Sequence, residues 1–107
     1  MIDVAVMYEN KDGARFDEDY YINKHLKLVH DLWDDMGLTK VQVERGVGGG
    51  APGEPATYKI IAHLVFDSME SLQKAMEKAG ALQEDLANFT DIPPTIQMSE
   101  VIHSETV

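Results

Sequence analysis

The sequence predicts an α+β domain in which strands and helices follow one another in the order β-α-β-β-α-β. Four segments show apolar residues alternating with period two, and two longer segments show apolar residues at helical spacing. The length of 107 residues suits one hydrophobic core and one domain over residues 1–107. We therefore expect a ferredoxin-like sandwich, a four-stranded antiparallel sheet with two helices on one face.

The predicted strands are short alternating segments rich in β-branched residues. They are Ile2–Tyr8, Leu38–Gly46, Tyr58–Phe66 and Thr95–Ile102. The third is apolar on both faces, which is typical of a strand that is buried on both sides. Helices cover only one face of such a sheet, so a second copy of the chain is the simplest cover for the other face. The sequence therefore predicts a homodimer.

The two predicted helices have recognisable ends. The first follows Asp17, a good N-cap residue, and stops at Gly37. The second follows Asp67 and Glu70, which form a box-like cap, and Gly80 is expected to break it into two pieces.

Composition excludes several classes of function. The net charge of −10 argues against nucleic acid and against an anionic membrane surface as partners. The chain has no cysteine, so disulfides and thiolate chemistry are excluded. No apolar run approaches the roughly 20 residues of a membrane span, and the N-terminus shows no export signal. We expect a cytoplasmic protein.

A glycine-rich segment separates the second and third predicted strands. Residues Gly46–Pro55 include five glycines and two prolines. A phosphate-binding loop needs its glycines between a strand and a helix N-terminus, so nucleotide binding is not expected here. A long hairpin loop, with a lid as one option, is the expected structure.

His25 is the strongest candidate for chemistry. A helical wheel places it beside Tyr21 in the middle of the apolar stripe, whereas Tyr20 points about 100° away. An unpaired buried polar group costs about 1–3 kcal/mol, so His25 needs a partner or a cavity. One interpretation is a core histidine bonded to a backbone carbonyl, and the other is a neutral imidazole that acts as an acid or base.

Further candidates are weaker. His63 lies on a predicted strand. The face of the sheet to which its side chain points decides whether it approaches His25 or lies in the dimer interface. Trp33 would supply a ring wall, although aromatic residues at helical spacing are usually core. The segment from Asn88 to Asp91 would line a pocket mouth, although turn residues commonly bond to their own backbone. No clustered set of histidines and carboxylates suggests a metal site.

Several segments together resemble the EthD family in one continuous order. The matching segments are Ala14–Asp17, Tyr20–His25, Arg45–Gly46, Gly49–Gly53, His63–Ser68 and Asn88–Ile92. The resemblance implies a dimeric α+β barrel of ferredoxin-like protomers. The family is named for a protein associated with bacterial ethyl tert-butyl ether breakdown. Its wider superfamily resembles cofactor-independent monooxygenases, lactone isomerases, polyketide cyclases and haem-handling enzymes, so the fold does not decide the function.

The resemblance and the residues leave three hypotheses. The first is a cofactor-independent enzyme of oxygenase, isomerase or cyclase type that acts on an apolar or aromatic small molecule. His25 would move a proton, Tyr21 and His63 would orient a substrate oxygen, and Trp33 or Phe89 would form walls. The second is a binding or accessory protein of a degradation pathway that holds such a molecule without turnover. The third is a haem protein with His25 or His63 as axial ligand.

Overall fold

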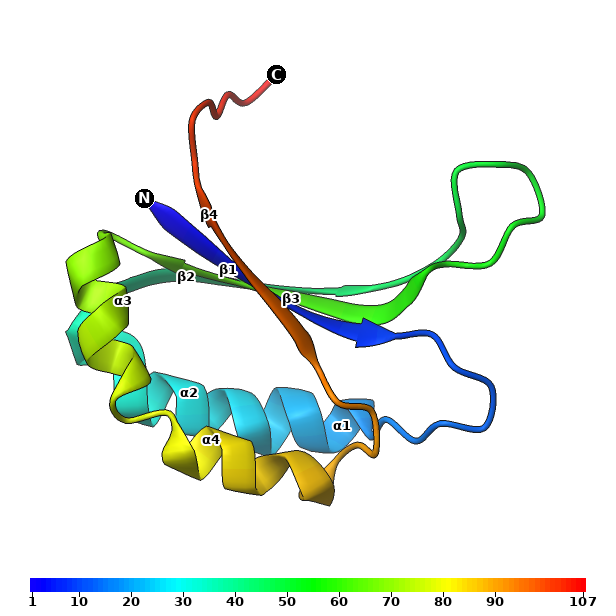
Figure 1. Cartoon of the computed structure of the whole chain (residues 1–107), viewed down its shortest axis with the longest axis horizontal. Helices are drawn as coiled ribbons and strands as arrows, with labels where there is room; N and C mark the ends of the chain where they lie inside the picture. The colour runs from blue at the N-terminus through cyan, green and yellow to red at the C-terminus, as the bar shows by residue number, and fades with distance from the viewer.

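Four antiparallel strands form one sheet in the order β2-β3-β1-β4. The computed structural model describes residues 1–107, and its strands are β1 (Ile2–Glu9), β2 (Leu38–Arg45), β3 (Tyr58–Phe66) and β4 (Thr95–Glu100). All helices lie on one side of this sheet (Figure 1). The ferredoxin-like α+β fold predicted from the sequence is therefore confirmed.

The first helical region is continuous but contains three kinds of turn. It consists of α1 (Glu18–Tyr20), the π-helical η1 (Tyr21–His25), α2 (Leu26–Trp33) and the 3-10 turn η2 (Asp34–Met36). Asp17 caps its start, because the Oδ1 atom accepts a hydrogen bond from the backbone N–H of Tyr20 at 3.0 Å. Gly37 ends it with a φ of +90°, a conformation that favours glycine. Both predicted helix ends are confirmed.

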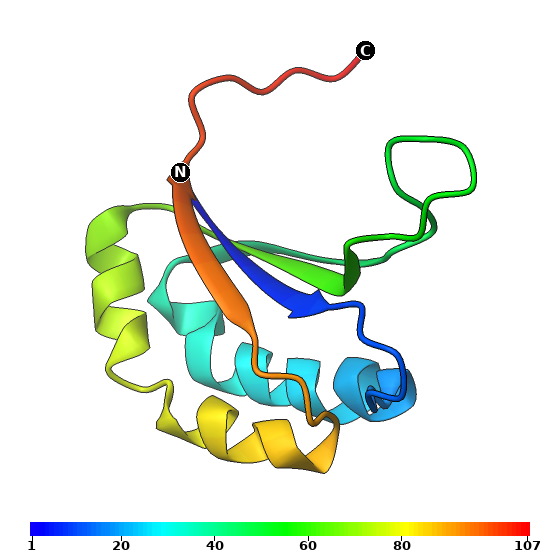
Figure 2. The ribbon, with the colours of Figure 1, turned by 45° about the vertical axis from the view of Figure 1, so that its right-hand side comes forward.

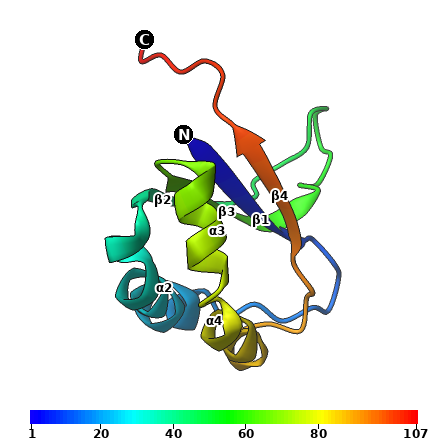
Figure 3. The ribbon, with the colours of Figure 1, turned by 60° about the vertical axis from the view of Figure 1, so that its left-hand side comes forward.

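The second helical region breaks where predicted. It consists of α3 (Met69–Met76), α4 (Gly80–Asp85) and the 3-10 turn η3 (Leu86–Asn88). Its N-cap is Ser68 rather than Asp67, because the Ser68 hydroxyl accepts the backbone N–H of Ser71 at 3.1 Å. The break before Gly80 lets α4 turn away from α3 and run beside α2 under the sheet (Figure 3). This change of direction brings the end of α4 to the start of the first helical region.

The core between sheet and helices divides into two clusters. One contains Trp33 with mainly aliphatic residues and lies against α3. The other is largely aromatic, and its buried members are Tyr8, Tyr21, Ile60, Ala62, Phe89 and Ile92. The aromatic cluster joins η1 to the end of β1 and the start of β3. It surrounds His25, so the candidate site lies in this half of the molecule.

The face of the sheet opposite the helices carries no covering element (Figure 3). On β3 the side chains that face the helices are buried, whereas those on the open face, including Ile61, His63 and Val65, are half-buried. Ala5 and Met7 of β1 share this open face, since they pair with His63 and Ile61. The open face is therefore partly apolar, as expected from the sequence of the third strand.

The glycine-rich segment forms the connection between β2 and β3, as predicted. It extends away from the helices as an open loop (Figure 2). The backbone N–H of Gly49 bonds to the carbonyl of Glu54 at 2.7 Å, which closes the loop as a hairpin. None of the helices is both long enough and apolar enough to cross a bilayer.

Candidate functional site

The site begins with the π-helical turn η1. In this turn the backbone N–H of Leu26 bonds to the carbonyl of Tyr21, five residues earlier. A π-helical turn contains more residues than an α-helical turn, so residues five apart come onto one face. Tyr21 and His25 are buried together, as predicted. The prediction that Tyr20 points away from them is wrong, because the wheel assumed regular α-helix and the wide turn brings Tyr20 and His25 to a common partner.

That partner is Asp85, at the end of α4. Its Oδ1 atom accepts hydrogen bonds from the Tyr20 hydroxyl at 2.6 Å and from the Asn88 side-chain amide at 2.9 Å. Its Oδ2 atom lies 2.8 Å from Nδ1 of His25. The side chains of His25 and Asp85 are only 8% and 13% exposed. The sequence gives no local signal for Asp85, because nothing near it distinguishes it from the many surface acids of this chain.

The ionised state of Asp85 decides which hydrogen bond Nδ1 of His25 makes. Burial raises the pKa of the Asp85 carboxyl, but the hydrogen bonds from Tyr20, Asn88 and His25 together outweigh burial and hold the pKa below its ordinary value. Asp85 is therefore ionised at neutral pH and can only accept hydrogen bonds, so Nδ1 of His25 carries a proton. In the neutral imidazole the lone pair is then on Nε2, which makes no hydrogen bond to the protein.

Aromatic rings enclose the imidazole of His25. The ring of Tyr21 stacks on it with centroids 5.1 Å apart, and the ring of Phe89 lies at 4.6 Å. Burial raises the pKa of the Tyr21 hydroxyl, and the nearby Tyr8 hydroxyl adds to this effect. Neither hydroxyl forms a hydrogen bond within the protein. Every side-chain oxygen or nitrogen that is fully buried does have a hydrogen-bond partner, so these two oxygens are not fully buried. Both hydroxyl oxygens therefore keep a small surface that is accessible to water.

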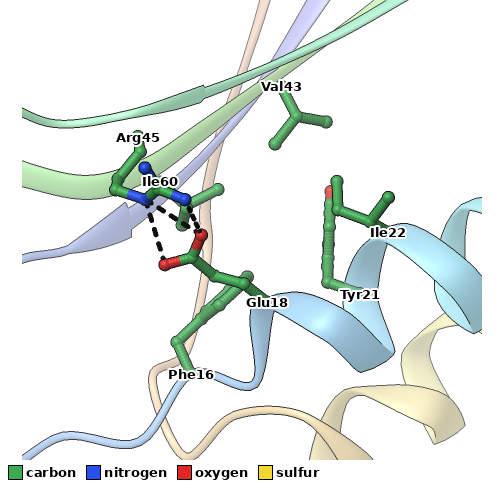
Figure 4. Close-up of a pocket in the computed structure, with 7 residues that line it drawn as sticks. All are labelled: Phe16, Glu18, Tyr21, Ile22, Val43, Arg45 and Ile60. Atoms are coloured by element: carbon green, nitrogen blue, oxygen red, sulfur yellow. Dashed lines mark hydrogen bonds and ion pairs between the residues drawn. The ribbon is translucent and has the colours of Figure 1, made fainter.

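A cavity of about 250 Å³ opens between the first helical region and the sheet (Figure 4). Its lining consists of Phe16, Glu18, Tyr21, Ile22, Val43, Arg45 and Ile60. Five of the seven are hydrophobic, and the two charged residues form an ion pair with each other. The Tyr21 side chain extends toward Val43 across this space. His25 does not line the cavity itself, but its ring stacks on that of Tyr21.

The structure does not bring Trp33 to this site. Trp33 is buried in the other cluster, where its ring lies 5.5 Å from that of Phe66. Its Nε1 atom donates a hydrogen bond to the carbonyl of Ala75 at 2.9 Å. Trp33 therefore joins α2 to α3 and forms no wall of the cavity.

His63 is also separated from His25, because it lies on the open face of the sheet. Its Nδ1 atom lies 3.0 Å from Asp3, and its Nε2 atom lies 3.3 Å from Glu44. No group of three or more His, Cys, Asp or Glu side chains has a geometry that would hold a metal ion. The sequence left two placements open for His63, one toward the helices and one away from them. The structure has the second.

Residues 88–91, which follow α4, have two different roles in the structure. Asn88 and Phe89 contact the site through Asp85 and His25, as described above. Asp91 instead accepts the backbone N–H of Arg15 at 2.9 Å, and Thr90 donates to the carbonyl of Arg15 at 2.7 Å. Asp91 thus holds two loops together and does not face the cavity.

Comparison with known proteins decides the family. An EthD domain model matches residues 13–93, a span that includes the π-helical turn, the cavity and Asp85. The chain belongs to the EthD family. An EthD-like protein from Ralstonia eutropha JMP134 is 37% identical, with a TM-score of 0.89 over 98% of this chain and 95% of that one.

Two other solved structures are more distant. An ethyl tert-butyl ether D (EthD) family protein from Bacillus halodurans C-125 is 24% identical, with a TM-score of 0.71 over 95% of this chain and 99% of that one. A dimeric ferredoxin-like protein from an uncultured marine organism is 16% identical, with a TM-score of 0.54 over 100% and 99%. These two share the fold of this EthD chain. No functionally curated protein matches it.

Proposed function

We propose that this EthD-family chain is a small enzyme that transfers protons on an apolar or aromatic small molecule, using side chains of the Tyr21–His25–Asp85 set. One observation carries the proposal: the Asp85 carboxylate holds Nδ1 of a buried histidine, and the tyrosine stacked on that histidine faces an apolar cavity. A base oriented by a carboxylate is the arrangement that general base catalysis needs.

Each residue has a distinct role in this proposal. Tyr21 donates a hydrogen bond from its free hydroxyl to a carbonyl or phenol oxygen of the substrate. His25 takes up the substrate proton at Nε2 through water, because the ring of Tyr21 separates the imidazole from the cavity. Asp85 is a positioning residue that keeps Nδ1 protonated and stabilises the imidazolium as it forms. Proton removal of this kind is shared by isomerisations, cyclisations and the activation of phenols for oxygen chemistry.

The proposal is tested by His25→Gln together with a matched control. His30 is the matched residue, because its Nδ1 atom likewise contacts a carboxylate, that of Asp34 at 2.7 Å, but on the exposed face of the helix. We expect His25→Gln to abolish deuterium exchange of acidic C–H positions in cyclic ketones and phenols, and His30→Gln to leave the exchange unchanged. Exchange in His25→Gln at the wild-type rate would overturn the role of His25.

A binding protein without turnover is the second candidate. The observation in its favour is that the cavity contacts Tyr21 but not His25, so a ligand can be held without reaching the base. Saturable binding of phenols, with no solvent-derived deuterium in the recovered ligand, would favour this candidate. The cavity does not favour haem, since about 250 Å³ is below the roughly 300–1,000 Å³ typical of sites for drug-sized ligands.

We also propose that the chain acts as a homodimer joined through the open face of its sheet. Half-buried apolar side chains on that face, including Ile61 and Val65, support this proposal. A second sheet packed against them would remove their remaining apolar surface from water.

A further inference from the structure

The mouth of the cavity holds an arginine whose donors are only partly used. The Nε atom of Arg45 lies 2.9 and 3.2 Å from the two carboxylate oxygens of Glu18, and its Nη2 atom lies 2.6 Å from Oε1. A guanidinium carries five N–H donors in a planar fork. Glu18 occupies the Nε edge of that fork, whereas Nη1 makes no hydrogen bond in the protein. One edge of Arg45 is therefore free for a second oxyanion.

Two positively charged side chains act on Glu18 at this mouth. The hydrogen bond from Arg45 holds the pKa of Glu18 below its ordinary value, and the positive charge of Lys59 lowers it further against the effect of burial. Two cations thus act on one carboxylate, in a chain whose net charge is −10.

The lining beyond the ion pair is suited to a hydrophobic ring. Phe16, Val43 and Ile60 are apolar, and the Tyr21 hydroxyl is the one polar group in their midst. A cavity of about 250 Å³ is smaller than a typical site for a drug-sized ligand, which limits the occupant to one or two rings.

We propose that the substrate of this cavity carries an anionic carboxylate as well as an apolar or aromatic body, and that the free edge of Arg45 binds that carboxylate. Planar bidentate recognition of carboxylates is the characteristic use of arginine. Glu18 then acts as the residue that orients the guanidinium. This inference rests on the proposed function, because it assigns a substrate class to the same cavity.

Three probes of matched shape test the inference: 6-hydroxy-2-naphthoate, neutral 2-naphthol and the cationic 6-(aminomethyl)-2-naphthol. Their dissociation constants would be measured by calorimetry on the full chain and on Arg45→Gln. We expect the wild type to prefer the carboxylate over 2-naphthol by about fivefold, a size typical of one exposed charge pair. The aminomethyl compound should bind more weakly than 2-naphthol. Arg45→Gln should abolish the preference for the carboxylate over 2-naphthol.

Lys40→Gln is the matched control, because it removes the same charge from the same strand on the opposite face of the sheet. It should keep the preference of the wild type. Equal affinity of the wild type for naphthoate and naphthol, a preference that survives in Arg45→Gln, or no binding of either probe would overturn the inference. The proposed proton transfer is tested separately, by deuterium exchange in His25→Gln. The carboxylate preference and the proton transfer can therefore fail independently.

Discussion

Tyr20 and His25 bind the two different oxygens of one carboxylate. The Tyr20 hydroxyl donates to Oδ1 of Asp85 at 2.6 Å, and Nδ1 of His25 lies 2.8 Å from Oδ2. The two residues are five positions apart, and the π-helical turn between them places both on the side that α4 contacts. The orientation of the buried imidazole is thus determined by a residue of a different helix.

Asp85→Asn is expected to lower the rate of the proposed proton transfer by at least about tenfold, since oriented general bases contribute about 10²–10⁴-fold. The neutral amide no longer requires a proton on Nδ1, so part of the His25 population changes tautomer. Turnover and the nitrogen NMR shifts of the His25 ring would measure both effects. Glu84→Gln, which removes an exposed neighbouring charge, should change neither. An unaltered tautomer in Asp85→Asn would contradict the role assigned to Asp85.

The stability of the protein should depend on pH through Asp85. Its folded-state pKa lies below the ordinary value, so the folded chain binds this proton less readily than the unfolded chain does. The stability from this group is present above the unfolded-state pKa of about 3.9 and is lost as pH falls through the lower folded-state pKa. Urea unfolding of the wild type and Asp85→Asn between about pH 6 and pH 3 would measure the difference. Parallel losses in both proteins would exclude a contribution from Asp85.

Two adjacent tyrosines should respond differently to the loss of a hydroxyl. Tyr21→Phe is expected to keep the free energy of unfolding within about 0.5 kcal/mol, because the Tyr21 hydroxyl has no protein partner, yet to weaken the binding of phenols. Tyr20→Phe removes a hydrogen bond that lowers the pKa of Asp85, so that pKa should rise. Chemical denaturation, phenol titration and carboxyl NMR would separate the two variants. The idea fails if Tyr21→Phe binds 2-naphthol as tightly as the wild type.

Trp33→Phe should destabilise the fold without affecting the cavity. The change removes the Nε1–H donor, although the carbonyl of Ala75 still accepts the backbone N–H of Lys78 at 3.0 Å. The expected loss is therefore that of one hydrogen bond, about 0.5–1.5 kcal/mol. Thermal unfolding would show the loss, and titration with 2-naphthol should give the wild-type dissociation constant. A clear drop in 2-naphthol affinity, measured under conditions in which the variant is fully folded, would instead connect Trp33 to ligand binding.

The open face of the sheet should mediate self-association. We expect light scattering at micromolar concentration to give twice the chain mass of 11.9 kDa. Ile61→Arg places a charge in the centre of this face and should shift the protein to monomer, because an unpaired charge is costly to bury. Gln97→Arg, on the outer part of the same face at the edge strand β4, should have a smaller effect. A wild-type mass of one chain would contradict the homodimer.

The sequence by itself determined the order of strands and helices and the burial of Tyr21 and His25. These features depend on local causes: period-two and helical spacing, the Asp17 cap, and the positive φ that Gly37 supplies. Local spacing also placed the helix break near Gly80. The EthD resemblance came from short segments that keep their order along the chain, and residues 13–93 match the family model.

Only the tertiary structure decided what His25 contacts. Asp85 is 60 positions away, so its contact with His25 depends on how α4 packs beside the first helical region. A π-helical turn leaves no clear mark in a pattern of apolar residues, and the wheel therefore misplaced Tyr20. The alternation of β3 defines two faces, but which face the helices cover depends on connections between distant elements, and this put His63 on the open side. Contacts between distant elements follow from packing of the whole chain, which local spacing does not encode.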